Sequence, residues 1–111
     1  MNIKEYKQIA KLIRDNETYR VYDLSKLKNL EISLTELHLN KSTKGHFHNG
    51  IDEVYIFIQG EGEMEIGEKI FKVKAGDIML VEPGKFHKVY NKGKEDLNFW
   101  AIFEKYEGRG K

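Results

Sequence analysis

The chain has 111 residues, a length that supports one hydrophobic core and therefore one domain, spanning residues 1–111. Its formal net charge is +1, with 19 basic and 18 acidic side chains interspersed, so the charge gives no basis for binding nucleic acid or an anionic membrane. Because the sequence contains no cysteine, disulfides, thiolate metal ligands and cysteine nucleophiles are excluded.

The hydropathy pattern bears on the compartment. The first residues carry no long apolar segment, and no run approaches the roughly eighteen apolar residues of a membrane span. We therefore expect a cytoplasmic protein. Many lysines and glutamates, few glutamines and no cysteine favour a thermophilic source.

The first predicted element is an amphipathic helix over residues 2–14. Its apolar residues recur at intervals of three and four, with lysines between them, as expected for a helix that packs on the outside of the domain. A helix that binds a partner is the alternative. The pair Asp15-Asn16 ends the pattern.

The rest of the chain consists of short strand-like segments separated by turns. Strands are predicted over 18–24 and 31–39, and then over 46–48, 53–59, 62–66, 69–74, 77–82, 86–91 and 96–104. Glycine, asparagine and proline mark the turns between them. This spacing predicts an all-β sandwich or barrel over about residues 18–106, whereas residues 107–111, polar and rich in glycine, are expected to fray.

Histidines and one glutamate form the pattern that carries chemistry. His46 and His48 lie two residues apart, so on an extended backbone both side chains leave the same face. Glu53 follows after a short connection, and His87 lies in a second segment. Three imidazoles and one carboxylate delivered from strands are a ligand set for a borderline transition metal. His38 stands apart from this pattern and is interpreted as an ordinary strand residue.

Strand alternation extends the predicted site to its walls. If the four candidate ligands point inward, the residues two and four positions away on the same strands point inward with them. The predicted cavity walls are therefore Tyr55, Phe57 and Val89, and the residues predicted to face the opposite layer are Val54, Ile56 and Ile58.

Two segments, 45–60 and 76–91, resemble the two conserved motifs of the cupin superfamily, whose fold is a small double-stranded β-helix (jelly-roll) barrel. The first motif is matched by Gly45, His46, His48, Glu53 and Gly60, and the second by Gly76, Gly84, His87 and Asn91. The usual proline position holds Glu82, with Pro83 one residue later. The resemblance implies a jelly-roll barrel with a short N-terminal helix, and one divalent metal ion on His46, His48, Glu53 and His87.

A narrower resemblance concerns the first motif, which is similar to that of the cupin-type glucose-6-phosphate isomerases of archaea. It implies that Thr43 and Gly45 hold a substrate phosphate and that Tyr55 lines the site. The chain departs from that family at Phe103, where the family has a tyrosine, and lacks a further tyrosine of the family's C-terminal tail. Tyr106 is a candidate replacement. The family also has a longer N-terminal portion and a slightly wider spacing between the histidine pair and the glutamate.

Three functions fit these observations, because the cupin fold by itself does not determine the reaction. The first is an aldose–ketose isomerase that acts on a small sugar or sugar phosphate, with Glu53 or Tyr55 as the acid–base group. The second is an Fe(II)-dependent dioxygenase, and the third is a non-catalytic cupin that binds a metal or a carbohydrate. Nitrogen and oxygen ligands suit manganese, iron, cobalt, nickel, copper or zinc, and four ligands leave about two positions for substrate oxygens.

We also expect a homodimer. Jelly rolls expose sheet edges, and the strand at 18–24 is predicted to pair with a neighbouring chain to cover one of them. The apolar outer face of Val54, Ile56 and Ile58 is a second predicted dimer surface.

Overall fold

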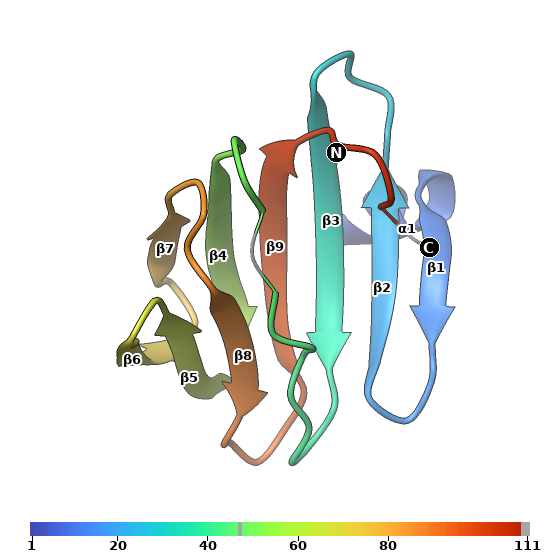
Figure 1. Ribbon diagram of the computed structural model, residues 1–111. Coiled ribbons are helices and arrows are strands. Elements are labelled where there is room, and N and C mark those ends of the chain that lie inside the picture. Colours follow the sequence, from blue (N-terminus) through green and yellow to red (C-terminus); the bar gives the residue numbers. More distant parts are fainter. Residues whose placement is uncertain (47, 110–111) are drawn as a thin grey trace.

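The computed structural model describes residues 1–46 and 48–109 (Figure 1). Within these residues the chain forms one helix and nine strands. The helix is α1 (Ile3–Ile9), and the strands are β1 (Lys11–Asp15), β2 (Tyr19–Leu24), β3 (Leu30–Leu37), β4 (Glu53–Gln59), β5 (Glu61–Ile66), β6 (Lys69–Lys74), β7 (Ile78–Val81), β8 (His87–Asn91) and β9 (Leu97–Glu104).

The strands form two antiparallel sheets. In the larger sheet the order is β1-β2-β3-β9-β4-β7, and in the smaller sheet it is β6-β5-β8. Strand β9 thus lies between β3 and β4, as Figure 1 shows, although it follows both in the chain. This architecture confirms the predicted all-β jelly roll with a short N-terminal helix.

Alternation along the strands produces the core between the two sheets. In β4 the residues Glu53, Tyr55 and Phe57 are buried, whereas the residues between them are only half-buried on the outer face. Strand β8 alternates in the same way from His87 to Asn91. Both patterns agree with the predicted inward and outward faces. Apolar side chains from both sheets meet in this core, including Leu37, Phe57, Met64, Val73, Val89 and Leu97.

The predicted helix over residues 2–14 is wrong in its second half. The helix begins with a capping box between Asn2 and Glu5 and ends at Ile9, because Ala10 is extended. Residues 11–15 form β1 instead, which pairs with β2. Hydrogen bonds to a neighbouring strand outweigh the local helical spacing, which is weak evidence over five residues.

The predicted exposed edge at 18–24 is also wrong. Strand β2 pairs with β1 on one side and with β3 on the other, so neither of its edges is open. The larger sheet ends at β1 and β7. In the described part of the chain no helix is both long and apolar enough to cross a membrane.

Candidate metal centre

The imidazoles of His46, His48 and His87 and the carboxylate of Glu53 converge at one place. One candidate ligand atom from each lies within 4.8 Å of those of the other three. The Nε2 atoms of His48 and His87 are each 3.5 Å from an oxygen of Glu53. The backbones of His46 and His87 form an antiparallel bridge, with N–H···O distances of 3.2 and 2.9 Å, and this bridge holds the two rings together.

Backbone carbonyls orient two of these rings. The Nδ1 atom of His46 lies 3.1 Å from the carbonyl oxygen of Lys44, and Nδ1 of His87 lies 3.1 Å from that of Lys85. A carbonyl can only accept a hydrogen bond, so each Nδ1 carries the proton and each Nε2 keeps a lone pair. This arrangement is the usual support for a metal-binding histidine.

One buried atom provides a direct test of whether a metal fits. The Nε2 atom of His87 is buried and has no hydrogen-bond partner among the described residues. A buried polar atom without a partner is costly, and a metal ion would satisfy its lone pair. Three imidazole nitrogens and one carboxylate form a donor set suited to a divalent transition metal. The group could therefore hold such an ion.

The protonation states also suit a metal. Burial lowers the pKa of His46 and His48 and lowers that of His87 to about 4, so the imidazoles favour the neutral form. Burial raises the pKa of Glu53 to about 7, although the positive charge of Arg109 acts in the opposite direction. In the metal-free site, Glu53 is therefore the group whose proton competes with an ion near neutral pH.

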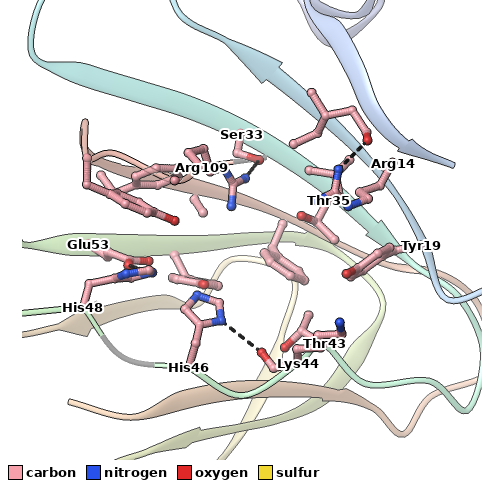
Figure 2. A pocket seen from close by; sticks show the side chains of 18 residues that line it. Arg14, Tyr19, Ser33, Thr35, Thr43, Lys44, His46, His48, Glu53 and Arg109 are labelled. Atoms are coloured by element: carbon pink, nitrogen blue, oxygen red, sulfur yellow. Dashed lines mark hydrogen bonds and ion pairs between the residues drawn. The ribbon is translucent and has the colours of Figure 1, made fainter. Parts of the chain in front are cut away.

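Three members of the cluster, His46, His48 and Glu53, form part of the wall of a cavity of about 230 Å³ (Figure 2), whereas His87 is buried behind them. This volume lies below the roughly 300 Å³ at which pockets for drug-sized ligands begin, so the cavity fits a small molecule. The lining is rich in hydroxyl groups and cations. The hydroxyl residues are Tyr19, Ser33, Thr35, Thr43, Tyr55 and Tyr106, and the cationic residues are Arg14, Lys44 and Arg109.

Two of the predicted substrate-binding residues line this cavity. Thr43 does so with its hydroxyl oxygen accepting a hydrogen bond of 3.0 Å from the backbone N–H of Val89. Tyr55 lines it with a ring centroid 5.7 Å from that of His87. Both side chains can therefore meet a molecule bound beside the cluster.

Three other predicted residues lie elsewhere. Phe57 and Val89 are fully buried in the core rather than on the cavity wall. Alternation predicts which face of the sheet a side chain points to, but it does not predict whether that part of the face is packed or lines a cavity. Gly45 packs against Phe86, whose ring would lie 2.1 Å from a Cβ atom at this position. Its role in the described structure is thus to allow a close approach, and it does not line the cavity.

The C-terminal segment contributes residues that sequence reasoning did not identify as site residues or named only as a possibility. The ring of Tyr106 lies over that of His48, with centroids 4.3 Å apart. Arg109 donates hydrogen bonds of 3.0 and 3.1 Å to Asp23 and one of 3.0 Å to Ser33. These contacts contradict the predicted fraying for Arg109, whereas residues 107 and 108 are exposed and residues 110–111 lie outside the described structure. A single arginine in a glycine-rich segment carries no sequence signal that could have revealed these contacts.

Residues 33–103, more than half of the chain, match the cupin domain family, and the chain belongs to this family. The predicted membership is confirmed. A glucose-6-phosphate isomerase of Pyrococcus furiosus is 33% identical over 100 residues, which cover 78% of this chain and 53% of that protein. An oxalate-binding protein of Thermotoga maritima is 37% identical over 57 residues, covering 51% of this chain and 47% of that protein.

The chain thus spans about half the length of these two relatives. Among solved structures, a protein of Thermus thermophilus superposes with a TM-score of 0.78 at 23% identity, covering 94% of this chain and 97% of that one. At this identity the likeness concerns the fold alone.

Proposed function

We propose that this chain is a metal-dependent cupin in which His46, His48, Glu53 and His87 hold one divalent transition metal ion. We propose further that it acts on a small sugar or sugar phosphate as an aldose–ketose isomerase. The observation that carries this proposal is the position of three of these four residues on the wall of a small cavity rich in hydroxyl groups and cations. The similarity to the glucose-6-phosphate isomerase of Pyrococcus furiosus supports the reaction type.

A bound divalent ion would supply a Lewis acid that polarises the substrate carbonyl, whose oxygen and the neighbouring hydroxyl oxygen it could hold. The chain itself supplies the proton-transferring groups. Burial raises the pKa of Tyr55, so its hydroxyl stays protonated and is suited to donate a hydrogen bond to a substrate oxygen. Glu53, a base that metal ligation would weaken, would accept a proton from the carbon next to the carbonyl and return it to the former carbonyl carbon. A proton would pass between the two substrate oxygens, so that the hydroxyl and the carbonyl exchange places. Thr43 and the lining cations would orient the substrate.

The test compares two histidine variants on metal-reloaded protein. The stripped protein is loaded separately with Mn, Fe(II), Ni and Zn, and isomerisation of fructose-6-phosphate and related sugars is followed by NMR. We expect one ion per chain and turnover in the unmodified protein, with both lost in His48→Ala. The matched control is His38→Ala, because His38 lies outside the cluster and contacts Asp96. Turnover or full metal content in His48→Ala would contradict the proposal.

The second candidate function is non-catalytic binding of a small anion. The small cavity, its cations and the similarity to an oxalate-binding protein of Thermotoga maritima favour it. Stoichiometric metal with ligand binding but no turnover on any sugar would select this function. Oxygen consumption with the Fe(II) form would instead select the dioxygenase.

Further predictions about the whole protein remain proposals. We propose that it forms a homodimer through the outer face of its larger sheet, where Ile78 and Leu80 are 61% and 71% exposed. A single domain over residues 1–111, a cytoplasmic location and a thermophilic source stay predictions from the sequence.

A further inference from the structure

Arg109 reaches the cavity from the end of the described chain and is held there by two strands of the larger sheet. Its Nε and Nη2 atoms donate to the carboxylate of Asp23 on β2, and Nη2 also donates to the hydroxyl of Ser33 on β3. Its guanidinium carbon lies 4.9 Å from the centroid of the Phe103 ring. A planar cation fixed at both its edge and its face has a defined orientation.

The contacts of Arg109 leave part of the guanidinium for a ligand. A guanidinium has five N–H donors, and in the part of the chain that the structure describes its hydrogen bonds come from Nε and Nη2. The two N–H groups of Nη1 take part in none of these hydrogen bonds, and the hydroxyl of Tyr106, which also lines the cavity, is the neighbouring group that interacts with the guanidinium. In Figure 2, Arg109 and Ser33 lie on one side of the cavity, and Glu53, His46 and His48 lie on the other.

The charge of the lining indicates what kind of molecule fits between these two sides. Glu53 is the one carboxylate among the described residues that line the cavity, whereas Arg14, Lys44 and Arg109 are cationic. Even with the charge of Arg109 balanced by Asp23 behind the wall, the two cations Arg14 and Lys44 outnumber Glu53. A divalent ion on the cluster would add two further positive charges. An anion enters such a cavity favourably, and a neutral sugar gains nothing from the excess positive charge.

We propose that Arg109 is the anion-recognition residue of the cavity: Nη1 binds the carboxylate or phosphate group of a small sugar derivative whose other oxygens reach the metal cluster. Asp23 and Ser33 are its positioning residues. This inference rests on the proposed function for the metal end of the ligand. It further assigns the chemical class, a sugar acid or a sugar phosphate, and the residue that selects it.

The test is a calorimetric titration of the metal-loaded protein with three probes, namely fructose-6-phosphate, glucuronate and neutral fructose. For the unmodified protein we expect at least one anionic probe to bind about tenfold or more tighter than fructose, since a hydrogen-bonded charge pair contributes at least that much. Binding of fructose-6-phosphate alone identifies phosphate as the group, and binding of glucuronate alone identifies carboxylate.

The variants isolate Arg109. In Arg109→Gln we expect the affinity for the anion to fall about tenfold or more, while the affinity for fructose and the metal content stay unchanged. Because this change leaves the buried Asp23 unpaired, the double variant D23N/R109Q, in which both groups are neutral, is measured beside it and should show the same loss. The control is Arg20→Gln, which removes the same charge from the outer face of β2, where Arg20 contacts Asp15 and Glu36.

The outcomes separate this proposal from the proposed function. Unchanged anion affinity in both Arg109 variants, or no preference for either anion over fructose, would overturn the assignment even if the protein isomerises sugars. An Arg109-dependent preference for an anion in a protein that turns over no sugar would support the assignment while the isomerase function fails.

Discussion

His46 and His87 are oriented by the chain that precedes them. In each case the Nδ1 proton points to the carbonyl of the residue two positions earlier, so Nε2 faces the cluster before any ion arrives. Little rearrangement of these rings is then needed on metal binding, which favours a rigid coordination geometry. His48 receives its support from a different source, the ring of Tyr106.

The raised pKa of Glu53 predicts how metal affinity depends on pH. Below its pKa of about 7 the metal-free site holds a proton on Glu53 that an ion must displace, whereas His87, with a pKa of about 4, is already neutral. We therefore expect the affinity for Mn(II) to rise with pH, by up to about tenfold per unit, and to level off above about pH 7. Calorimetry of the stripped protein in buffers of different ionisation enthalpy measures the released proton.

The control for this pH dependence is Glu53→Gln, which cannot lose a proton. It should bind the ion more weakly, and its affinity should depend less steeply on pH between about 6 and 7. A flat profile in the unmodified protein would show that Glu53 is already ionised in the free site.

The convergence of the four candidate ligands could be predicted from the sequence. Alternation along the strands and the spacing of the two motifs indicate which side chains share one face. Alternation could not separate the cavity wall from the core, so Phe57 and Val89 were placed wrongly. The position of Arg109 could not be predicted for another reason, since its partners Asp23 and Ser33 lie 86 and 76 residues away in the sequence. Contacts at that distance depend on the completed fold.

Among the elements, α1 shows how a short helix is fixed to a sheet. A seven-residue helix has little stability of its own, so tertiary contacts must hold it. Tyr6 provides them: its hydroxyl lies 2.8 Å from the carbonyl oxygen of Tyr22 and 2.7 Å from that of Ile32, and its ring meets Trp100 edge-on at 4.7 Å. The helix is thereby attached to the face of the larger sheet that points away from the metal cluster.

Replacing Tyr6 with phenylalanine tests this attachment. The ring is kept but the buried hydroxyl is lost, so we expect the free energy of unfolding to fall by about 1–2 kcal/mol. Urea denaturation measures the change, and the metal content should not alter. Tyr22→Phe is the control, because Tyr22 is only half-buried and it should change stability by less than about 0.5 kcal/mol. Equal stability of Tyr6→Phe and the unmodified protein would show that the hydroxyl contributes nothing net.

The strands were more predictable than the helix. Most predicted strand limits lie within one or two residues of the observed ones, because glycine turns such as Gly60, with a φ of 84°, and two-residue alternation leave few choices. There are two exceptions. The predicted strand over 46–48 is not formed: His46 makes only an isolated bridge with His87, and residue 47 lies outside the described residues. The other exception is β1, where Leu12 and Ile13 continue the helical spacing of the preceding residues. Residues 11–15 become a strand because they pair with β2, and the residues of the segment itself do not indicate that pairing.

For the whole molecule, the outer face of the larger sheet is the surface that we expect to bind a second copy of the chain. Leu80 on β7 lies opposite Val54 on β4, and Ile78 lies opposite Ile56, so these four side chains form one apolar surface. Two of the four, Ile78 and Leu80, are exposed, and neighbouring exposed apolar side chains are a feature of interaction sites. A second copy of the chain would cover it and the neighbouring edge of β7.

Sedimentation velocity at micromolar concentration tests this association. We expect a species of twice the 13.0 kDa chain mass, and a monomer for Leu80→Glu, since a buried unpaired carboxylate opposes the contact. Leu27→Glu is the control, because Leu27 is 50% exposed in the connection between β2 and β3. A monomeric unmodified protein would remove the homodimer proposal, and metal binding should be the same in all three proteins.

The place of β9 between β3 and β4 has a consequence for synthesis of the chain on the ribosome. All four candidate ligands have been translated once His87 is added, yet the two halves of the larger sheet cannot join until β9, which ends at Glu104, has followed. At about 5–20 residues per second this interval lasts roughly 1–3 seconds. The strand that completes the sheet contributes none of the four clustered groups, and it is translated after the other eight described strands. Until it arrives, the nascent chain carries every ligand but lacks the junction that fixes β4 beside β3.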